Sequence, residues 1–185
     1  DRDGAGSIVT CTTFWYGKDN KIQPIKMIDK GKINLGKDWA MCTDKIFGLG
    51  TWRDPRGDQA GTVMGMAALG NSDRYMSYFD GALTSRLFDG DGNCNIDFDY
   101  LKKEADKSEQ NKFDISASLQ AETEKVIKAL LTPYIEKYKP KNLCLSGGVS
   151  LNCVSVGKML DWFPGINIFV DPIPYDAGLS IGSFF

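Results

Sequence analysis

One stretch of the chain, NLCLSGGVSLNCVSVG from Asn142 to Gly157, constrains the fold more than any other. Residues 143–145 form a short apolar run that predicts a buried strand. The Ser146-Gly147-Gly148 segment predicts a tight turn, because glycine lets the backbone bend freely and approach a ligand closely. Ser150 and Asn152 can then accept hydrogen bonds from the free amides at the start of a helix.

A strand that ends in glycines and leads into a helix predicts a site for an anion or a nucleotide. The amides and the helix dipole both favour negative charge at that position. Many α/β proteins use the same turn for packing alone, so the pattern by itself leaves a structural role open.

The rest of the C-terminal half predicts helices that alternate with strands. Asp114 to Lys139 has the broad apolar stripe of a long helix, with Asp114 as its N-cap and Pro133 as a kink or the end of its regular part. Strands separated by helices imply parallel pairing with right-handed crossovers. The elements expected next are a strand, a helix, a strand and a helix, at residues 143–145, 152–163, 166–170 and 176–185.

The N-terminal part predicts a β-hairpin and then a mainly helical insertion. Residues 7–16 and 21–28 favour strands, with a turn at Gly17–Asn20. Residues 38–50 have helical periodicity, and residues 102–112 are interpreted as a solvated charged stretch.

Small residues recur at helical spacing in a second segment of the insertion, at Gly61, Gly65 and Ala68. Two interpretations remain for them. They let a neighbouring backbone pack closely, or they line an active cleft.

The order of these elements is typical of an α/β fold. It matches one half of an actin-, hexokinase- or Hsp70-like protein. We therefore expect residues 1–185 to form one ribonuclease-H-like unit with a mixed sheet and an insertion at about residues 31–112. In that fold the opening turn at Asp3–Gly6 holds phosphate, although an ordinary β-turn is the other interpretation.

Composition excludes several classes of function. The chain has 22 Lys and Arg residues against 24 Asp and Glu, so neither a nucleic-acid surface nor a polybasic membrane patch is expected. No apolar run is long enough to span a bilayer, and no signal peptide is expected. Five scattered cysteines predict reduced thiols in a cytoplasmic protein, with Cys144 and Cys153 as core fillers. The chain has no histidine, which removes the commonest metal ligand.

Several segments together resemble the O-carbamoyltransferases of the nodulation-protein and antibiotic-tailoring type. They are DISASLQAETEKV from Asp114, NLCLSGGVSLNCVSVGKML from Asn142 and IFVDPIPYDAGLSIGSFF from Ile168. GTVMGMAALG from Gly61 and the opening Asp3-Gly4-Ala5-Gly6 also resemble that family. The likeness is to the C-terminal part of the catalytic domain, and the combination is specific although each segment alone is not.

This resemblance implies a reaction in which ATP and carbamoyl phosphate give a carbamoyl-adenylate, whose carbamoyl group moves to the hydroxyl of a small-molecule acceptor. It implies that Asp176 helps to hold a divalent metal ion, iron or magnesium, although Asp176 can also be read as a helix N-cap. The family's histidine ligands lie N-terminal to the turn at Asp3 and are not in this chain. The nucleotide-binding residues that the resemblance implies are Asp3, Gly4, Gly6, Ser146, Gly147, Gly148, Val149 and Asn152.

Two other functions remain open at this point. One is a related enzyme of the same fold, either threonylcarbamoyl-transferring or sugar-kinase-like. The other is a nucleotide-binding module without catalysis. We expect the isolated chain to lack the N-terminal half of its domain and to be inactive by itself.

Overall fold

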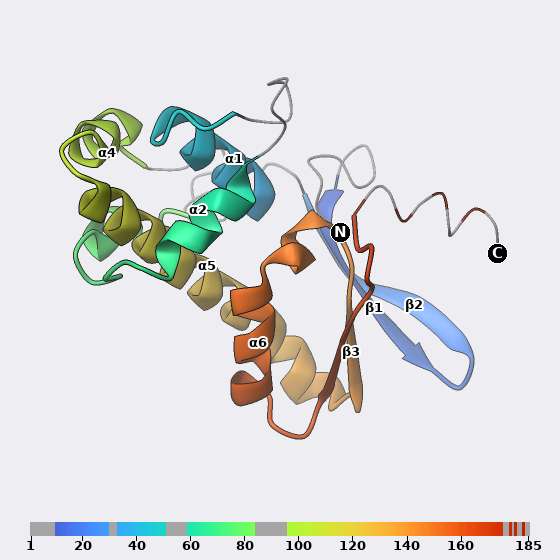
Figure 1. Ribbon diagram of the computed structural model, residues 1–185. Coiled ribbons are helices and arrows are strands. Elements are labelled where there is room, and N and C mark those ends of the chain that lie inside the picture. Colours follow the sequence, from blue (N-terminus) through green and yellow to red (C-terminus); the bar gives the residue numbers. More distant parts are fainter. Residues whose placement is uncertain are drawn as a thin grey trace.

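The computed structural model describes residues 10–29, 33–50, 59–83, 96–175, 178, 180 and 183. One long helix, α5 (Glu109–Tyr138), runs through the middle of the molecule, and most other elements pack around it (Figure 1). None of the described helices is both long enough and apolar enough to cross a lipid bilayer.

The segment between the hairpin and α5 is mainly helical, as expected. It contains α1 (Leu35–Lys45), α2 (Ala60–Ala67), the 3-10 helix η1 (Met76–Tyr78) and α4 (Phe98–Ala105). These helices gather around the N-terminal half of α5 (Figure 1). Their apolar side chains form the core with those of α5, and its largest fully buried apolar members are Ile33, Ile46, Val63, Phe79, Leu83, Leu101, Ile115, Leu119 and Val126.

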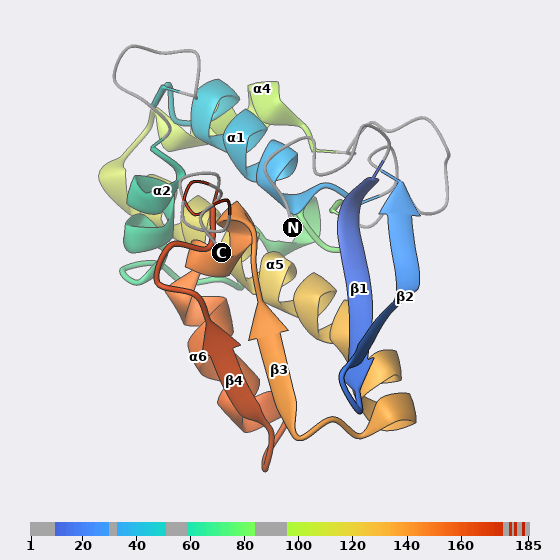
Figure 2. The same ribbon diagram turned by 90° about the vertical axis from the view of Figure 1, so that its right-hand side faces the viewer.

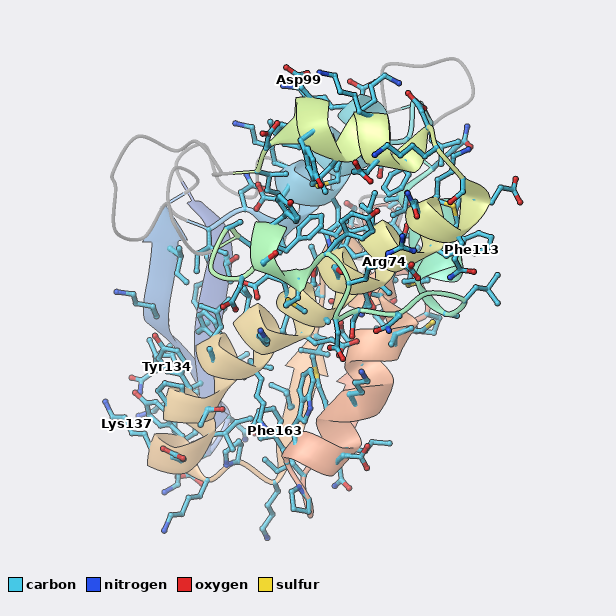
Figure 3. The ribbon with its side chains drawn as sticks, turned by 90° about the vertical axis from the view of Figure 1, so that its left-hand side faces the viewer. Arg74, Asp99, Phe113, Tyr134, Lys137 and Phe163 are labelled. Atoms are coloured by element: carbon cyan, nitrogen blue, oxygen red, sulfur yellow. The ribbon has the colours of Figure 1, made fainter. Side chains whose placement is uncertain are left out.

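The predicted hairpin is confirmed. Strands β1 (Thr10–Lys18) and β2 (Lys21–Asp29) pair antiparallel across a two-residue turn at Asp19 and Asn20. Both turn residues have positive φ, 49° and 59°, as a primed turn requires. The Phe14 ring stacks on Tyr134 of α5 with centroids 4.6 Å apart, so the hairpin packs on the C-terminal half of α5 (Figure 3).

The predicted parallel unit is also confirmed. Strands β3 (Asn142–Leu145) and β4 (Asn167–Val170) pair parallel, and α6 (Cys153–Trp162) connects them. The two sheets lie on the same side of α5 (Figures 1 and 2). In each strand of this pair alternate residues pack toward the core, while the others, Cys144 and Phe169 among them, are exposed.

A single mixed sheet is not observed among the described residues. Two separate two-stranded sheets are present instead, one antiparallel and one parallel. In the part of the chain that the structure describes, β1 bonds to β2 and β3 bonds to β4, but no ladder joins the two pairs.

The predicted solvated stretch at residues 102–112 is mostly exposed, although Ala105 and Asn111 in it are buried. Two predictions about helix ends were wrong. Helix α5 begins at Glu109 with Ser108 as its N-cap, so Asp114 lies inside the helix. Helix α1 begins at Leu35, earlier than predicted, with the Asn34 side chain accepting from the amide of Lys37.

Helix α5 continues through Pro133 to Tyr138, so the proline does not end it. Trp39 and Cys42 share the buried face of α1, as the helical periodicity of residues 38–50 predicted, and Ile46, directly after the helix, is also buried. Lys139 closes α5 in the left-handed conformation, with φ of 44°.

The middle of α5 is buried on nearly every side, and much of what it buries is polar. The buried polar residues are Asp114, Ser116, Ser118, Gln120, Glu122, Thr123 and Glu124. Three of them, spaced four residues apart, face the segment 69–83. Asp114 accepts from the amide of Asn71, Ser118 donates to the carbonyl of Ser72, and Glu122 accepts from the amide of Gly81. This row anchors the segment to the helix.

Asp114 makes the densest of these contacts. Its carboxylate accepts from the amide of Asn71 at 2.8 Å, the Gln110 side chain at 2.9 Å and the Arg74 guanidinium at 2.9 Å. Burial by itself raises the pKa of Asp114, but these donors together outweigh burial and hold the pKa below its usual value.

Gly70 lies very close to the backbone of α5. A Cβ built there would lie 2.0 Å from the carbonyl oxygen of Phe113, in the backbone of α5. Nothing lies within 4 Å of a Cβ built at Gly61 or Gly65. The close packing considered for the glycines at helical spacing is therefore not found at those two positions.

We expect Gly70→Ala to destabilise the chain by about 1–3 kcal/mol, because its methyl group would collide with the backbone of α5. The matched control is Gly65→Ala, an exposed position inside α2, where alanine should stabilise by roughly 1 kcal/mol. Urea denaturation of both variants tests this. Equal midpoints would contradict the close approach.

We expect Asp114→Asn to destabilise the chain at neutral pH. We also expect the stability of this variant to decrease less than that of the wild type as the pH is lowered. A carboxylate with a lowered pKa stabilises the fold above its unfolded-state pKa, and this contribution is lost as pH falls through the folded-state value. The melting temperature should drop by about 2–8 °C at pH 7, with a smaller difference near pH 3. A difference independent of pH would show that the charge of Asp114 is not involved.

Candidate functional site

The strand, glycine turn and helix predicted around residue 147 are all present. After β3, Gly147 has φ of 97° and ψ of 157°. This region of the Ramachandran plot is essentially restricted to glycine. A short 3-10 helix, η2 (Gly148–Leu151), follows and leads to Asn152, the N-cap of α6. The 3-10 turn was not predicted, and of the two glycines Gly147 carries the unusual conformation.

The turn after β3 is hydrogen-bonded to the loop after β4. Pro174 provides the carbonyl that accepts from both the amide of Gly147 and, at 3.4 Å, the hydroxyl of Ser146. Both loops leave the carboxyl edge of the parallel pair (Figure 2). This edge is where ligands bind in open α/β sheets. The structure thus brings Ser146 and Gly147 together with the segment that leads to residue 176.

Asn152 caps α6, as the sequence predicted. Its Oδ1 accepts from the amide of Ser155 at 3.0 Å. The same side chain forms a reciprocal amide pair with Gln120 of α5, in which Asn152 Nδ2 donates to Gln120 Oε1 at 2.8 Å and Gln120 Nε2 donates to Asn152 Oδ1 at 3.2 Å. These contacts occupy the oxygen of Asn152 and one of its two N–H groups.

The other predicted site residues are distributed as follows. Gly148 opens η2, and Val149 packs its side chain against the core, so at Val149 only the backbone can face a ligand. Ser150 is a member of η2 and is not the helix cap. The remaining predicted residues, Asp3, Gly4, Gly6 and Asp176, lie outside the described residues.

Four polar residues next to the turn were not singled out from the sequence. Gln120 and Glu124 come from α5, and Ser155 and Lys158 come from α6. Gln120, Glu124 and Ser155 are at most 8% exposed. The sequence feature that could have indicated Gln120 and Glu124 is their spacing of four residues, which places both side chains on one face of a helix. That signal is weak, because such pairs are also common on solvated faces.

The predicted burial of two cysteines was wrong. Cys144 and Cys153 are exposed, whereas Cys42 is buried. Cys144 is on the outer face of β3, because a strand turns successive side chains to opposite faces and Leu143 and Leu145 take the inner one.

The described residues do not contain a group of three or more His, Cys, Asp or Glu side chains that could hold a metal ion. Glu124, the carboxylate among the four polar residues next to the turn, is instead paired with Lys158 at 2.5 Å. The described part of the site therefore does not fit a metal centre by itself.

We expect Gly147→Ala to destabilise the chain by about 1–3 kcal/mol, because alanine would be strained at this φ and ψ. Gly157→Ala, inside α6 with open space around the new methyl group, should instead be neutral or stabilise by up to about 1 kcal/mol. Thermal melts of the two variants give the comparison. If Gly147→Ala melted like the wild type, the turn would not need glycine at this position.

Comparison with known proteins agrees with the resemblance. Residues 2–184 match the family model described as "Carbamoyltransferase N-terminus". The chain is 29% identical over 205 residues to "Uncharacterized protein sll1178" of Synechocystis sp., covering 98% of this chain and 31% of that protein. It is 32% identical over 133 residues to "Nodulation protein NolO" of Bradyrhizobium diazoefficiens, covering 65% of this chain and 23% of that protein.

A further relative is "Nodulation protein NolNO" of Sinorhizobium fredii, 40% identical over 70 residues, which cover 38% of this chain and 10% of that protein. The chain thus spans less than a third of the length of these curated relatives. Because the family model covers nearly the whole chain, the chain belongs to the carbamoyltransferase family, in the part described as the carbamoyltransferase N-terminus.

Proposed function

We propose that this chain is part of an O-carbamoyltransferase that uses ATP to activate carbamoyl phosphate as a carbamoyl-adenylate. The carbamoyl group then moves to the hydroxyl of a small-molecule acceptor. The observation that carries the proposal is the family match over residues 2–184. The turn at Gly147, joined to Pro174 at the carboxyl edge of a parallel strand pair, supports it as a place for the nucleotide.

The role proposed for the turn after β3 is to bind phosphate groups of ATP. Residues 146–149 follow β3 at the carboxyl edge of the sheet, and Gly147 allows a path without a side chain. The first amides of α6 lie just beyond and have no partner within the helix. Both features favour an anion. Asp3, Gly4 and Gly6 are proposed to contact the same phosphates.

The ribonuclease-H-like fold is part of the same proposal. Its support is the combination of an antiparallel hairpin and a parallel β–α–β unit on one side of α5 (Figure 2). In the proposed fold the two pairs would be parts of one mixed sheet, which the described strands by themselves do not form.

Asp176 is proposed as a ligand of a divalent metal ion, iron or magnesium, together with residues that this chain does not contain. The described residues do not contain a group of side chains that could hold such an ion. The contribution assigned to the described residues is to bind and orient the nucleotide.

The products of ATP distinguish the proposal from its alternatives. Activation of carbamoyl phosphate in this way consumes water and releases phosphate and pyrophosphate, and transfer to the acceptor releases AMP. A sugar-kinase-like enzyme would release ADP instead, and a module without catalysis would release neither. The test is to incubate the full-length protein with ATP, with and without carbamoyl phosphate, and measure pyrophosphate. Release that depends on both compounds supports the proposal, and ADP formation or no release overturns it.

In the full-length protein we expect Asp176→Asn to abolish carbamoyl transfer and remove bound metal while leaving the melting temperature unchanged. Asparagine caps a helix about as well as aspartate but is a much poorer ligand for a divalent cation. The control is Asp171→Asn, an exposed residue of the same loop whose Oδ1 accepts from the amide of Ile173 and which asparagine can replace as an acceptor. Elemental analysis measures the bound metal of both variants, and an activity assay measures their carbamoyl transfer. Normal metal content and turnover in Asp176→Asn would contradict the metal role.

A further inference from the structure

A buried polar network connects the middle of α5 to the turn between β3 and α6. Gln120, which is 5% exposed, lies at its centre. Its Nε2 lies 2.9 Å from Glu124 Oε1, 3.1 Å from Ser155 Oγ and 3.2 Å from Asn152 Oδ1. Gln120 therefore contacts its own helix, the first turn of α6 and the residue that ends η2.

The reciprocal pair with Gln120 determines how the Asn152 side chain is held. A cap requires that Asn152 present its oxygen to the amide of Ser155. Gln120 reinforces this orientation, because its amide donates to that oxygen while its own oxygen accepts from Asn152 Nδ2. If the Asn152 amide were turned over, its Nδ2 would face the donor Gln120 Nε2, and its Oδ1 would face the acceptor Gln120 Oε1. The pair thus fixes the position of the residue that joins η2 to α6.

Glu124 extends the network to the surface. Its Oε1 accepts from Gln120, and its Oε2 accepts from Lys158 Nζ, whose side chain is 50% exposed. Lys158 balances the charge of this nearly buried carboxylate, which is costly to bury without a partner. With both oxygens used, Glu124 holds the Gln120 amide toward α6.

The network is unlike the other polar row of α5. Ser118 on the opposite side of the helix donates to the carbonyls of Ser72 and Asp114, and so anchors the segment 69–83. Only the row of Gln120 and Glu124, among the described residues of α5, reaches the turn that is proposed to bind the nucleotide.

We propose that Gln120 and Glu124 are positioning residues, which hold Asn152 and thereby set the conformation of the turn from Ser146 to Asn152 for nucleotide binding. The part that concerns the nucleotide rests on the proposed function. The part that concerns the turn rests on the hydrogen bonds alone. Neither residue is assigned a contact with the substrate.

The test compares Gln120→Leu with Ser118→Ala, a buried residue of the same helix whose hydrogen bonds go elsewhere. The first measurement is hydrogen exchange of the amides of residues 146–152, well below the melting temperature of each variant. We expect at least tenfold faster exchange in Gln120→Leu and wild-type exchange in Ser118→Ala. Equal exchange in this segment for both variants overturns the proposal.

The second measurement is the KM for ATP and the kcat of the full-length protein. A misplaced turn should raise the KM of Gln120→Leu about tenfold or more, whereas Ser118→Ala should keep the wild-type KM even if its melting temperature falls. An unchanged KM in Gln120→Leu overturns the nucleotide part. If the wild type shows no reaction with ATP, the proposed function fails, and the exchange experiment still decides whether Gln120 positions the turn.

A milder pair of variants covers the case in which Gln120→Leu does not fold. Lys158→Met removes only the charge partner of Glu124, at a half-exposed position, and Lys158→Arg keeps the charge. Faster exchange of residues 146–152 in Lys158→Met, restored in Lys158→Arg, supports the proposal. Wild-type exchange in both contradicts the role given to Glu124.

Discussion

The structure depends on burying the polar middle of α5 while most of its polar side chains hydrogen-bond to neighbouring elements. Leaving such a group unpaired away from water costs far more than a pair contributes. The helix meets this requirement by bonding to different neighbours on different faces. The segment 69–83 contacts one face through Asp114, Ser118 and Glu122, and α6 contacts another through Gln120 and Glu124. The arrangement of polar partners therefore determines where the neighbouring segments lie, while the apolar core supplies the burial.

The same helix links the fold to the candidate site. The turn at Gly147 is fixed on one side by Pro174, in the loop after β4, and on the other by Asn152, which Gln120 holds from α5. A ligand at the carboxyl edge of β3 and β4 would thus contact a turn whose position depends on three elements distant in sequence. These contacts hold a short, glycine-containing turn at the edge where the proposed nucleotide would bind.

Local features of the fold were predictable from the sequence where a short stretch carries its own reason to form. The hairpin, the buried face of α1 and the parallel unit from β3 to β4 follow from turn residues and periodicity. The hairpin turn is shorter than the predicted Gly17–Asn20, because Gly17 and Lys18 belong to β1. Asp114 shows where this reasoning ends. Its residue type and position favoured a helix cap, but the competing cap at Ser108 begins the helix earlier, and Asp114 instead binds Asn71 and Arg74.

The sequence by itself determined the family, through several segments taken together, and the strand–turn–helix at Gly147, which is encoded in adjacent residues. It offered Ser150 and Asn152 as caps, and the structure decided for Asn152. Only the tertiary structure decided what Gln120 and Glu124 contact, and that the exposed faces of β3 and β4 carry Cys144 and Phe169. A spacing of four residues places two side chains on one helix face, but it does not say which neighbour that face meets. That choice depends on how α5, α6 and the sheets pack together, and no short stretch of sequence contains it.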